Sequence, residues 1–336
     1  MKRLIFAIPL VLIALCSVSC SKEKTNSTND LIEVDDICSQ MDDDNFRLIC
    51  YERYDVNGDG KVSMEEAAKI EMIYLKNNIQ SLKGIEYFVN LKSLQTGYNQ
   101  LISLDVSKNT ALTRLDCEYN QLTSLDVSKN TALTRLKCNE NQLTSLDVSK
   151  NTALITLYCN NNQLTSLDVS NNTALTEFMC DRNQLAGLDV SNNTALTYFD
   201  CDNNQLTSLD ISKNTALREF SCGKNKLTSL DVSKNTDLSF LHCGSNQLIS
   251  LDVSNNTRLG TLICDNNQLT SLDVSKNTAL TSLRCNNNQL TSLDVSENTI
   301  LRELLCYNNP LTVLYVNENH IWNNLMKPDD CTIVYK

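Results

Sequence analysis

Short stretches of the central chain alternate hydrophobic and polar side chains. In one of them, Leu115 and Cys117 alternate with Arg114, Asp116 and Glu118. Because successive side chains of a strand point to opposite faces, this alternation predicts a short strand with one buried face. Three further apolar residues belong to the path by which the chain returns to the next strand: Leu122, Leu125 and Val127.

The same pattern returns every 21 residues up to about Val316, with no insertion between copies. The eleven copies begin at Leu91, Leu112, Leu133, Leu154, Leu175, Leu196, Leu217, Leu238, Leu259, Leu280 and Leu301. A fixed period of this size is typical of a solenoid, in which stacked copies join their apolar sides into one core. Neighbouring strands lie about 4.8 Å apart, so eleven copies predict a parallel sheet about 50 Å long.

One asparagine recurs in every copy, at Asn120 and its equivalents. These are Asn99, Asn141, Asn162, Asn183, Asn204, Asn225, Asn246, Asn267, Asn288 and Asn309. A side-chain amide both donates and accepts hydrogen bonds, so a stacked column of asparagines can satisfy backbone groups where the chain turns inward. We therefore interpret these residues as structural and assign them no role in binding.

The repeat resembles a known family. Its Leu-x-x-Leu-x-Cys-x-x-Asn-x-Leu pattern resembles the leucine-rich repeat signature, with cysteine at the third apolar position, over about two thirds of the chain. Together with the Leu-Asp-Val-Ser-x-Asn-Thr segment, it is similar to the repeats of internalin-like bacterial surface lipoproteins. The resemblance implies a curved, right-handed leucine-rich repeat solenoid, with a parallel sheet on the concave face and short turns or irregular structure on the convex face. It also implies a protein that binds a ligand and is not an enzyme.

A calcium-binding loop is predicted before the repeats. Residues 55–66 fit the pattern D-x-[DN]-x-[DN]-G-x5-E at every specified position. A hard cation takes several oxygen ligands, here from the side chains or the backbone of Asp55, Asn57, Asp59, Lys61, Ser63 and Glu66. Helices are expected at Asn45–Tyr54 and from Ser63 to about Tyr74. We predict one structural calcium ion that stiffens a small EF-hand-like N-terminal cap; the alternative is an acidic turn without calcium.

The N-terminus has the features of an export signal. A basic start at Lys2 and Arg3 precedes an apolar run and small residues, which is typical of a secretory signal peptide over residues 1–19. Ser17-Val-Ser-Cys20 resembles a relaxed bacterial lipobox, although serine stands three residues before the cysteine where leucine is usual. The resemblance implies a lipid on Cys20, and Ser21 then favours the outer membrane over the inner membrane. We expect this outer-membrane lipoprotein at the cell surface. The alternative is ordinary cleavage of the signal peptide.

These features divide the chain into five parts. The predicted signal peptide (1–19) is followed by the lipid anchor and a polar, flexible tether (20–35), the calcium-loop cap (36–76), the repeats (77–316) and a C-terminal cap (317–336). In the last part, Trp322 is expected in the cap core and Cys331–Tyr335 as a final strand.

The cysteines and the charge change this picture little. Ten cysteines occupy the same core position, at Cys117, Cys138, Cys159, Cys180, Cys201, Cys222, Cys243, Cys264, Cys285 and Cys306. Parallel Cβ vectors in such a stack disfavour disulfides, so we predict buried free thiols. Cys38 and Cys50 could form a disulfide within the cap, and the alternative is two free thiols. The formal net charge of −11 disfavours nucleic acid as a partner.

The strand positions that face outward vary from copy to copy, in contrast to the scaffold. Aromatic and arginine side chains are enriched at binding hot spots. The predicted ligand face comprises Tyr158, Tyr198, Phe240, His242, Arg114, Arg135, Arg218 and Arg284. We expect a monomer that binds a protein or glycan there. The alternatives are ordinary exposed residues on a spacer without a ligand, or a nutrient-binding lipoprotein that assists an enzyme or transporter.

Overall fold

The computed structural model describes residues 35–76 and 78–336. The predicted signal peptide, Cys20 and nearly all of the predicted tether lie outside the described residues. No helix in the described part of the chain has the length and apolarity needed to cross a bilayer.

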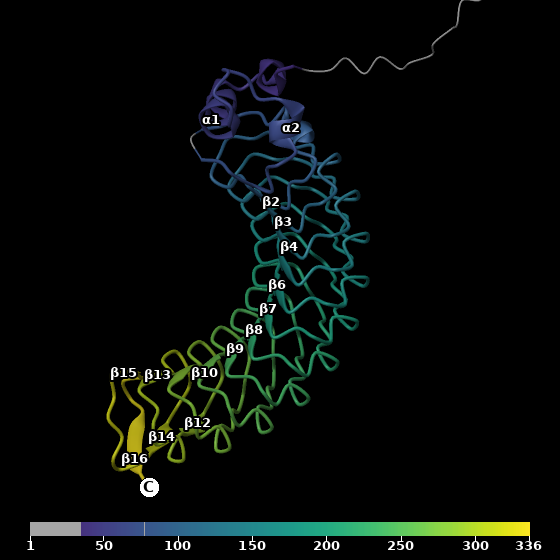
Figure 1. Ribbon diagram of the computed structural model, residues 1–336. Coiled ribbons are helices and arrows are strands. Elements are labelled where there is room, and N and C mark those ends of the chain that lie inside the picture. Colours follow the sequence, from purple (N-terminus) through teal and green to yellow (C-terminus); the bar gives the residue numbers. More distant parts are fainter. Residues whose placement is uncertain (1–34, 77) are drawn as a thin grey trace, which may run out of the picture. The chain divides into compact units, whose positions relative to one another are not determined.

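The repeats form a solenoid with one parallel sheet along its concave side (Figure 1). Each of the eleven copies contributes one strand to this sheet, which has thirteen strands in all. The eleven strands are β2 Ser93–Gln95, β3 Arg114–Asp116, β4 Arg135–Lys137, β5 Thr156–Tyr158, β6 Glu177–Met179, β7 Tyr198–Asp200, β8 Glu219–Ser221, β9 Phe240–His242, β10 Thr261–Ile263, β11 Ser282–Arg284 and β13 Glu303–Leu305. The expected leucine-rich repeat solenoid is confirmed.

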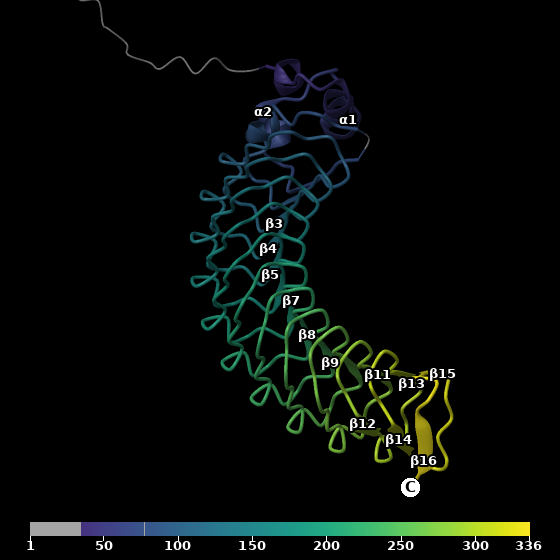
Figure 2. The same ribbon diagram turned by 180° about the vertical axis from the view of Figure 1, so that it is seen from behind.

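The register of the sheet follows the 21-residue period. Leu115 pairs with Leu136, and the flanking residues Arg114 and Asp116 pair with Arg135 and Lys137. The central side chain of each repeat strand is buried, whereas the flanking side chains point away from the core. Along most of the solenoid, the opposite side of the curve consists of turns and irregular segments, which Figure 2 shows projecting outward.

The core contains the ten cysteines in one continuous column. Each of them is 0 % exposed, and all thirteen cysteines of the described residues are free. Phe178, Phe199 and Phe220 replace leucine in three neighbouring repeats, and their rings stack with centroids 5.5 Å apart. The predicted stack of buried thiols is confirmed, and Cys38 and Cys50 are both buried without a disulfide.

Two columns of asparagine hold successive repeats together. In the predicted column, Asn120 Nδ2 donates to the carbonyls of Thr96 and Cys117, at 2.9 and 3.1 Å, and its Oδ1 accepts from the Leu101 amide at 3.0 Å. The second column was not predicted. It comprises Asn109, Asn130, Asn151, Asn172, Asn193, Asn214, Asn235, Asn256, Asn277 and Asn298, all 0 % exposed.

The N-terminal segment packs two short helices and a 3-10 turn against the first repeats. These are η1 Ile37–Gln40, α1 Asp44–Tyr54 and α2 Met64–Ala67, and a second 3-10 turn, η2 Ile85–Tyr87, follows later. Asp43 caps α1, and its carboxylate also accepts from the Gln80 amide at 2.7 Å, which ties the helix to the start of the solenoid. The expected first helix is confirmed.

The prediction that the second helix extends to about Tyr74 is wrong beyond Ala67. It ends there, and Met72–Tyr74 forms strand β1, which pairs with β2 in parallel. Ile73 is fully buried between two exposed neighbours, so its side chain joins the solenoid core in the way that Leu94 does one strand later. The concave sheet therefore begins within the segment predicted to be a separate cap.

The C-terminal segment is a further turn of the solenoid, and its Trp322, Leu325 and Ile333 pack against the core. Its strand β15 Asn324–Met326 extends the concave sheet beside β13. The expected last strand is present as β16 Thr332–Tyr335, which closes a second sheet with β12 Ser292–Asp294 and β14 Val313–Val316. Within the described residues nothing pairs with the outer edge of β15 or β16. Trp322 is only partly buried, and its ring stacks on that of His320.

Candidate functional site

The concave sheet presents two side-chain columns on every repeat strand, one on each side of the buried central residue. Arg114, Arg135, Tyr198 and Phe240 occupy the first column, and the second holds Tyr158, His242 and Arg284. Arg218 is the exception, because it precedes β8 and lies exposed outside both columns. The structure therefore places seven of the eight predicted ligand-face residues on one surface.

The N-terminal end of this surface is charged and aromatic. Arg114 Nε donates to Asp116 Oδ2 at 2.9 Å, and Arg135 Nε lies 3.6 Å from the other oxygen of the same carboxylate. Beside Arg114 is a hollow of about 170 Å³, which Tyr98 also lines. The Tyr98 ring stacks on that of Tyr119 with centroids 4.3 Å apart, and both side chains are exposed. This aromatic pair was absent from the predicted ligand face.

Tyr158 is held in place by its neighbours. Its hydroxyl donates to Glu177 Oε2 at 2.6 Å, and Lys137 Nζ lies 4.7 Å from the centre of its ring. Burial, and then the hydrogen bond to Glu177, raise the pKa of the Tyr158 hydroxyl. These contacts fix the ring before any ligand arrives, which lowers the entropy that binding would cost.

At the middle of the surface, Tyr198, Phe240 and His242 lie among carboxylates. His242 Nδ1 is 2.8 Å from Asp202 Oδ2. Burial alone would lower the pKa of His242, but the hydrogen bond to Asp202 and the charges of nearby aspartates outweigh burial and raise it. Tyr198 has its pKa raised to about 12, first by burial and then by Asp200.

Further along the solenoid, Arg284 Nη2 lies 3.2 Å from Glu303 Oε1, in an exposed ion pair. Exposed pairs of this kind contribute little to stability, about 0–1 kcal/mol. The guanidinium therefore remains accessible for contacts with a ligand.

Three aspartates of this surface were not predicted as site residues: Asp181, Asp200 and Asp202. Burial raises the pKa of Asp200 to about 7 and that of Asp181 to about 6. The sequence held a usable signal, because Asp181 and Asp202 follow the core cysteine in two neighbouring repeats. That signal was missed because acidic residues are numerous throughout the chain.

The predicted calcium loop is closed by hydrogen bonds of its own. Asp55 accepts from the amides of Gly58 and Gly60, each at 2.8 Å. Both glycines adopt positive φ, 74° and 81°, which the tight turn requires. Glu66 joins the two ends of the loop: Oε1 accepts from the Val56 amide at 2.9 Å, and Oε2 accepts from the amide and hydroxyl of Ser63. Ser63 and Glu66 also form a capping box at the start of α2.

The residue types of this loop suit calcium, but its present geometry is that of a hydrogen-bonded turn. Asn57 and Asp59 bond to each other at 3.0 Å, and the Lys61 amide donates to Asp59 at 2.9 Å. Hydrogen bonds, led by those from Ser63, hold the pKa of Glu66 down at about 2, so this carboxylate is ionised at neutral pH. In the described part of the chain, no three His, Cys, Asp or Glu side chains are grouped so that they could hold a metal ion.

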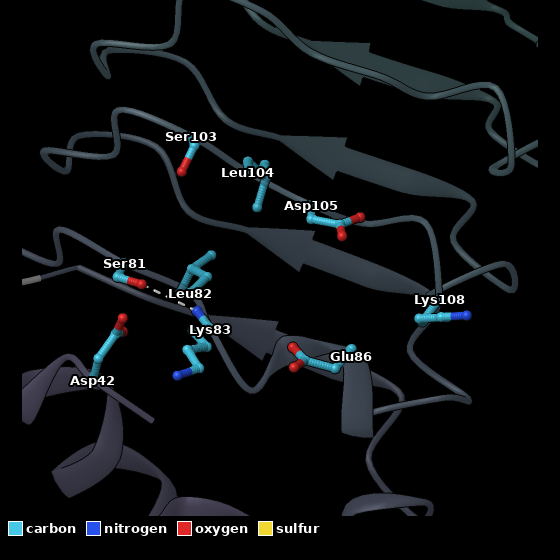
Figure 3. Close-up of a pocket in the computed structure, with 9 residues that line it drawn as sticks. All are labelled: Asp42, Ser81, Leu82, Lys83, Glu86, Ser103, Leu104, Asp105 and Lys108. Carbon is cyan, nitrogen blue, oxygen red and sulfur yellow. Dashed lines mark hydrogen bonds between the residues drawn. The ribbon is translucent and has the colours of Figure 1, made fainter. Parts of the chain in front are cut away.

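Another hollow lies away from the concave sheet, at the start of the solenoid (Figure 3). It measures about 490 Å³ and lies between Asp42 and the return segments of the first turns. Figure 3 shows Lys83, whose amide donates to Ser81, together with Glu86 and Lys108 around an open, polar space. Its side chains of mixed charge form no recognisable catalytic arrangement.

His242 and Cys243 are neighbours in sequence but face opposite sides of the sheet. Cys243 is 0 % exposed in the core, and burial raises its pKa to about 12, whereas His242 faces the concave surface. The thiol is therefore neither ionised nor within reach of the imidazole, as the alternation of strand side chains predicts.

Among known proteins, similarity to this chain is found in solved structures. No protein-family model matches the chain, and no curated protein does. The functional domain of InlJ from Listeria monocytogenes, described as including a cysteine ladder, is 36 % identical with a TM-score of 0.79; the match covers 89 % of this chain and 70 % of that domain. The internalin InlF of the same organism is 24 % identical with a TM-score of 0.63, over 88 % of this chain and 93 % of that one.

A leucine-rich repeat protein of Leptospira interrogans is 21 % identical, with a TM-score of 0.64, over 75 % of this chain and 74 % of its own. The likenesses to InlF and to the Leptospira protein show the fold alone. The InlJ domain is more similar, and its cysteine ladder is the feature that runs through the core here. The chain belongs to the internalin-like family of leucine-rich repeat proteins.

Proposed function

We propose that this protein is a non-enzymatic binding protein that holds a protein partner on the concave face of its solenoid. Leucine-rich repeat folds of this family commonly mediate protein binding and adhesion. The observation that carries the proposal is the central group of Tyr158, Tyr198, Phe240 and His242, partly buried side chains on one surface whose neighbours fix two of them in place. Rigid aromatic anchors surrounded by charged groups are the typical composition of binding hot spots.

The test is a capture experiment with matched variants. The protein is immobilised and exposed to surface and secreted proteins of a host cell and to a glycan panel. One variant carries Tyr158→Ala, Tyr198→Ala and Phe240→Ala. The control carries Ile102→Ala and Ile249→Ala, which remove exposed apolar side chains on return segments. We expect a protein captured by the wild type and the control and lost by the first variant. Equal capture by all three would contradict the concave site, and the absence of any partner would favour the spacer.

We further propose that the protein is an exported lipoprotein with its lipid on Cys20, displayed at the outer surface of the outer membrane. The support is the sequence of the N-terminus and the membership of the internalin-like family, whose members are surface or secreted proteins. Metabolic labelling with an alkyne-bearing fatty acid tests the lipid. Label should be incorporated into the wild type and be absent from Cys20→Ala, and label in both would contradict the assignment.

We also propose one structural calcium ion in the loop of residues 55–66. Asp55, Asn57, Asp59 and Glu66 would supply side-chain oxygens, Lys61 its carbonyl, and Ser63 its hydroxyl directly or through water. The ion would neutralise the clustered carboxylates. Glu66 already joins the start of the loop to α2, so calcium at this point would stiffen the attachment of the helices to the solenoid.

A further inference from the structure

Two hydrogen bonds join η1 to one face of α1. Just before η1, Asp36 Oδ2 accepts from the Tyr51 hydroxyl at 2.6 Å. Just after η1, the Met41 carbonyl accepts from Arg47 Nη1 at 3.1 Å. Arg47 and Tyr51 are four residues apart on α1 and therefore lie on the same face of the helix. The two bonds hold the 3-10 turn along this face.

Between these two bonds, each element carries a cysteine. Cys38 is inside η1, and Cys50 is on α1 between Arg47 and Tyr51. Position 50 is three residues after Arg47, so Cys50 lies on the face of α1 that receives η1. Both cysteine side chains are 0 % exposed and belong to the same hydrophobic core. The fold therefore brings the two cysteines to opposite sides of one buried contact.

The two thiols meet across this contact. Cys38 and Cys50 hydrogen-bond to each other through their side chains. That bond, followed by burial, raises the pKa of Cys50 far above its usual range. Because the thiolate is the form that attacks a disulfide, the closed pair is in contact but unreactive. Oxidation of the pair requires the elements to be folding or locally open.

The cysteine column of the repeats has a different geometry. Neighbours such as Cys201 and Cys222 occupy equivalent positions of parallel strands, so their Cβ atoms stay about one strand spacing apart, roughly 4.8 Å. A disulfide requires Cβ atoms about 3.5–4.5 Å apart. The Cys201 thiol instead donates to the Ser221 carbonyl at 3.3 Å. The column is therefore built to remain reduced, in contrast to the pair in the N-terminal segment.

We propose that Cys38 and Cys50 form a disulfide when the protein meets a disulfide oxidant outside the cytoplasm, and that this bond reinforces the contact between η1 and α1. One cysteine loses its proton and attacks a sulfur of the oxidant, which releases the first thiol of the oxidant and leaves a mixed disulfide. The thiolate of the other cysteine then attacks the mixed disulfide, forms the Cys38–Cys50 bond and releases the second thiol. Two cysteine thiols are oxidised, the oxidant disulfide is reduced to two thiols, and the departing sulfurs take up the two protons.

The disulfide would enclose the point at which α1 is attached to the solenoid. Asp43 lies inside the closed loop, where its carboxylate caps α1 and accepts from the Gln80 amide at 2.7 Å. The predicted tether precedes Cys38 in the chain, so a pull on the tether reaches η1 before α1. With the disulfide in place, η1 cannot separate from α1 under such a pull. The inference rests on the proposed export only for the source of the oxidant.

Mass spectrometry of the full chain tests the disulfide. The chain is exported into the periplasm of an expression host by a host signal peptide, so that the result does not depend on its own export signal. Free thiols are alkylated at lysis, and the protein is digested without reduction. Trypsin cuts after Arg47, between the two cysteines, so a disulfide joins residues 25–47 to residues 48–53 until a reductant is added.

We expect this joined pair in the exported chain, with the column cysteines and Cys331 alkylated, and two alkylated cysteines in a chain kept in the cytoplasm. In Cys50→Ala the remaining Cys38 should be alkylated, whereas the control Cys331→Ala should keep the joined pair. Alkylation of both Cys38 and Cys50 in the exported wild type would overturn the proposal. A disulfide from either of them to another cysteine would also overturn it.

Amide hydrogen exchange tests whether the bond reinforces the contact. Exchange within η1 and α1 should be at least about tenfold slower in the oxidised chain than after reduction, because the disulfide restricts local opening. Exchange in the distant strand β10 should not change. The double variant Cys38→Ala and Cys50→Ala should exchange at the same rate with and without reductant. Equal exchange of α1 in the oxidised and reduced wild type would refute the reinforcement.

Discussion

The side-chain amide of Asn193 donates a hydrogen bond of 2.9 Å to the backbone carbonyl of Asn172, its equivalent in the preceding repeat. The same nitrogen donates to the Val169 carbonyl at 3.0 Å. Each member of this column therefore satisfies two buried carbonyls of the repeat before it, and the column runs unbroken from Asn109 to Asn298. Hydrogen bonds from side chain to backbone thus connect the repeats on the side away from the concave sheet.

Replacing one member of this column should destabilise the solenoid strongly. In Asn193→Ala the buried carbonyls of Val169 and Asn172 keep the backbone amides of Asn172 and Leu175 as donors but lose the side-chain donor from the next repeat, and we expect a loss of about 1–3 kcal/mol. The control is Asn192→Ala at the exposed neighbouring position, where we expect a change within about 0.5 kcal/mol. Urea denaturation followed by circular dichroism measures both. Similar midpoints for the two variants would contradict the structural role of the column.

The cysteine column should behave as a hydrophobic core and not as a set of reactive thiols. Cys222 is 0 % exposed, and burial raises its pKa well above the usual range. We expect Cys222→Ala to cost about 1 kcal/mol and Cys222→Ser about 1–3 kcal/mol, because serine buries a hydroxyl that lacks an assured partner. In the native protein, Ellman's reagent at pH 8 should leave the column unmodified until denaturant is added. Rapid native labelling of Cys222 would show that the core is open.

Calcium should raise the thermal stability of the protein. Extracellular calcium modules bind with dissociation constants of roughly 10⁻⁴ to 10⁻³ M, so 10 mM calcium would stabilise the folded state by about 1.4–2.7 kcal/mol. The melting temperature with calcium is compared with that in a chelator. The stabilisation should disappear in Glu66→Gln and persist in Glu65→Gln, whose carboxylate pairs with Lys69 outside the loop. An unchanged melting temperature in the wild type would favour the calcium-free turn.

Stability should fall as pH rises through the range in which Asp200 ionises. Its pKa is about 7 in the folded protein, above the ordinary value of 3.8, because of burial and then the charge of Asp202. The unfolded chain therefore loses this proton near pH 4 and the folded chain only near pH 7. The resulting penalty is absent below pH 4 and complete above pH 7.

Asp200→Asn removes that penalty. Relative to the wild type, we expect it to be more stable by about 1–3 kcal/mol at pH 8, after allowance for partial solvent screening, and nearly unchanged at pH 4. Chemical denaturation of the two proteins at both pH values gives the difference directly. A variant that is less stable than the wild type at pH 8 would show that the ionised carboxylate is stabilised in the folded protein.

The repeats could be predicted from the sequence because the fixed 21-residue period determines which residues are in contact. Each strand pairs with the strand 21 residues away, so the position of Leu115 also predicts that of Leu136. Met72–Tyr74 lies before the first of the eleven copies, but the period does reach it: Ile70, Ile73, Leu75 and Asn78 stand 21 residues before Leu91, Leu94, Thr96 and Asn99, so a degenerate copy was readable there. Local patterns favoured a continuing helix there, and a non-local pairing decides the outcome.

The candidate site was also predictable in part, because side chains alternate between the two faces of a strand. Alternation places Tyr158 and His242 on the concave face, and the structure agrees. The raised pKa values of Asp181 and Asp200 depend on burial and on carboxylates in adjacent strands, which single residues do not reveal. That the C-terminal segment adds a strand to the concave sheet was also beyond reach, since the apolar residues near Trp322 suit a covering cap and a further turn equally.

One position in every repeat adopts a left-handed backbone conformation, with φ between 50° and 60° from Tyr98 to Asn308. Asparagine tolerates this conformation best among residues with a side chain, yet the chain places tyrosine, glutamate, arginine, lysine and serine there in several repeats. The left-handed conformation costs each of these residues roughly 1 kcal/mol of stability, and it places a distinct side chain beside the concave sheet. The eleven-fold redundancy of the scaffold makes such losses tolerable, so the surface can diversify without a change in the architecture that carries it.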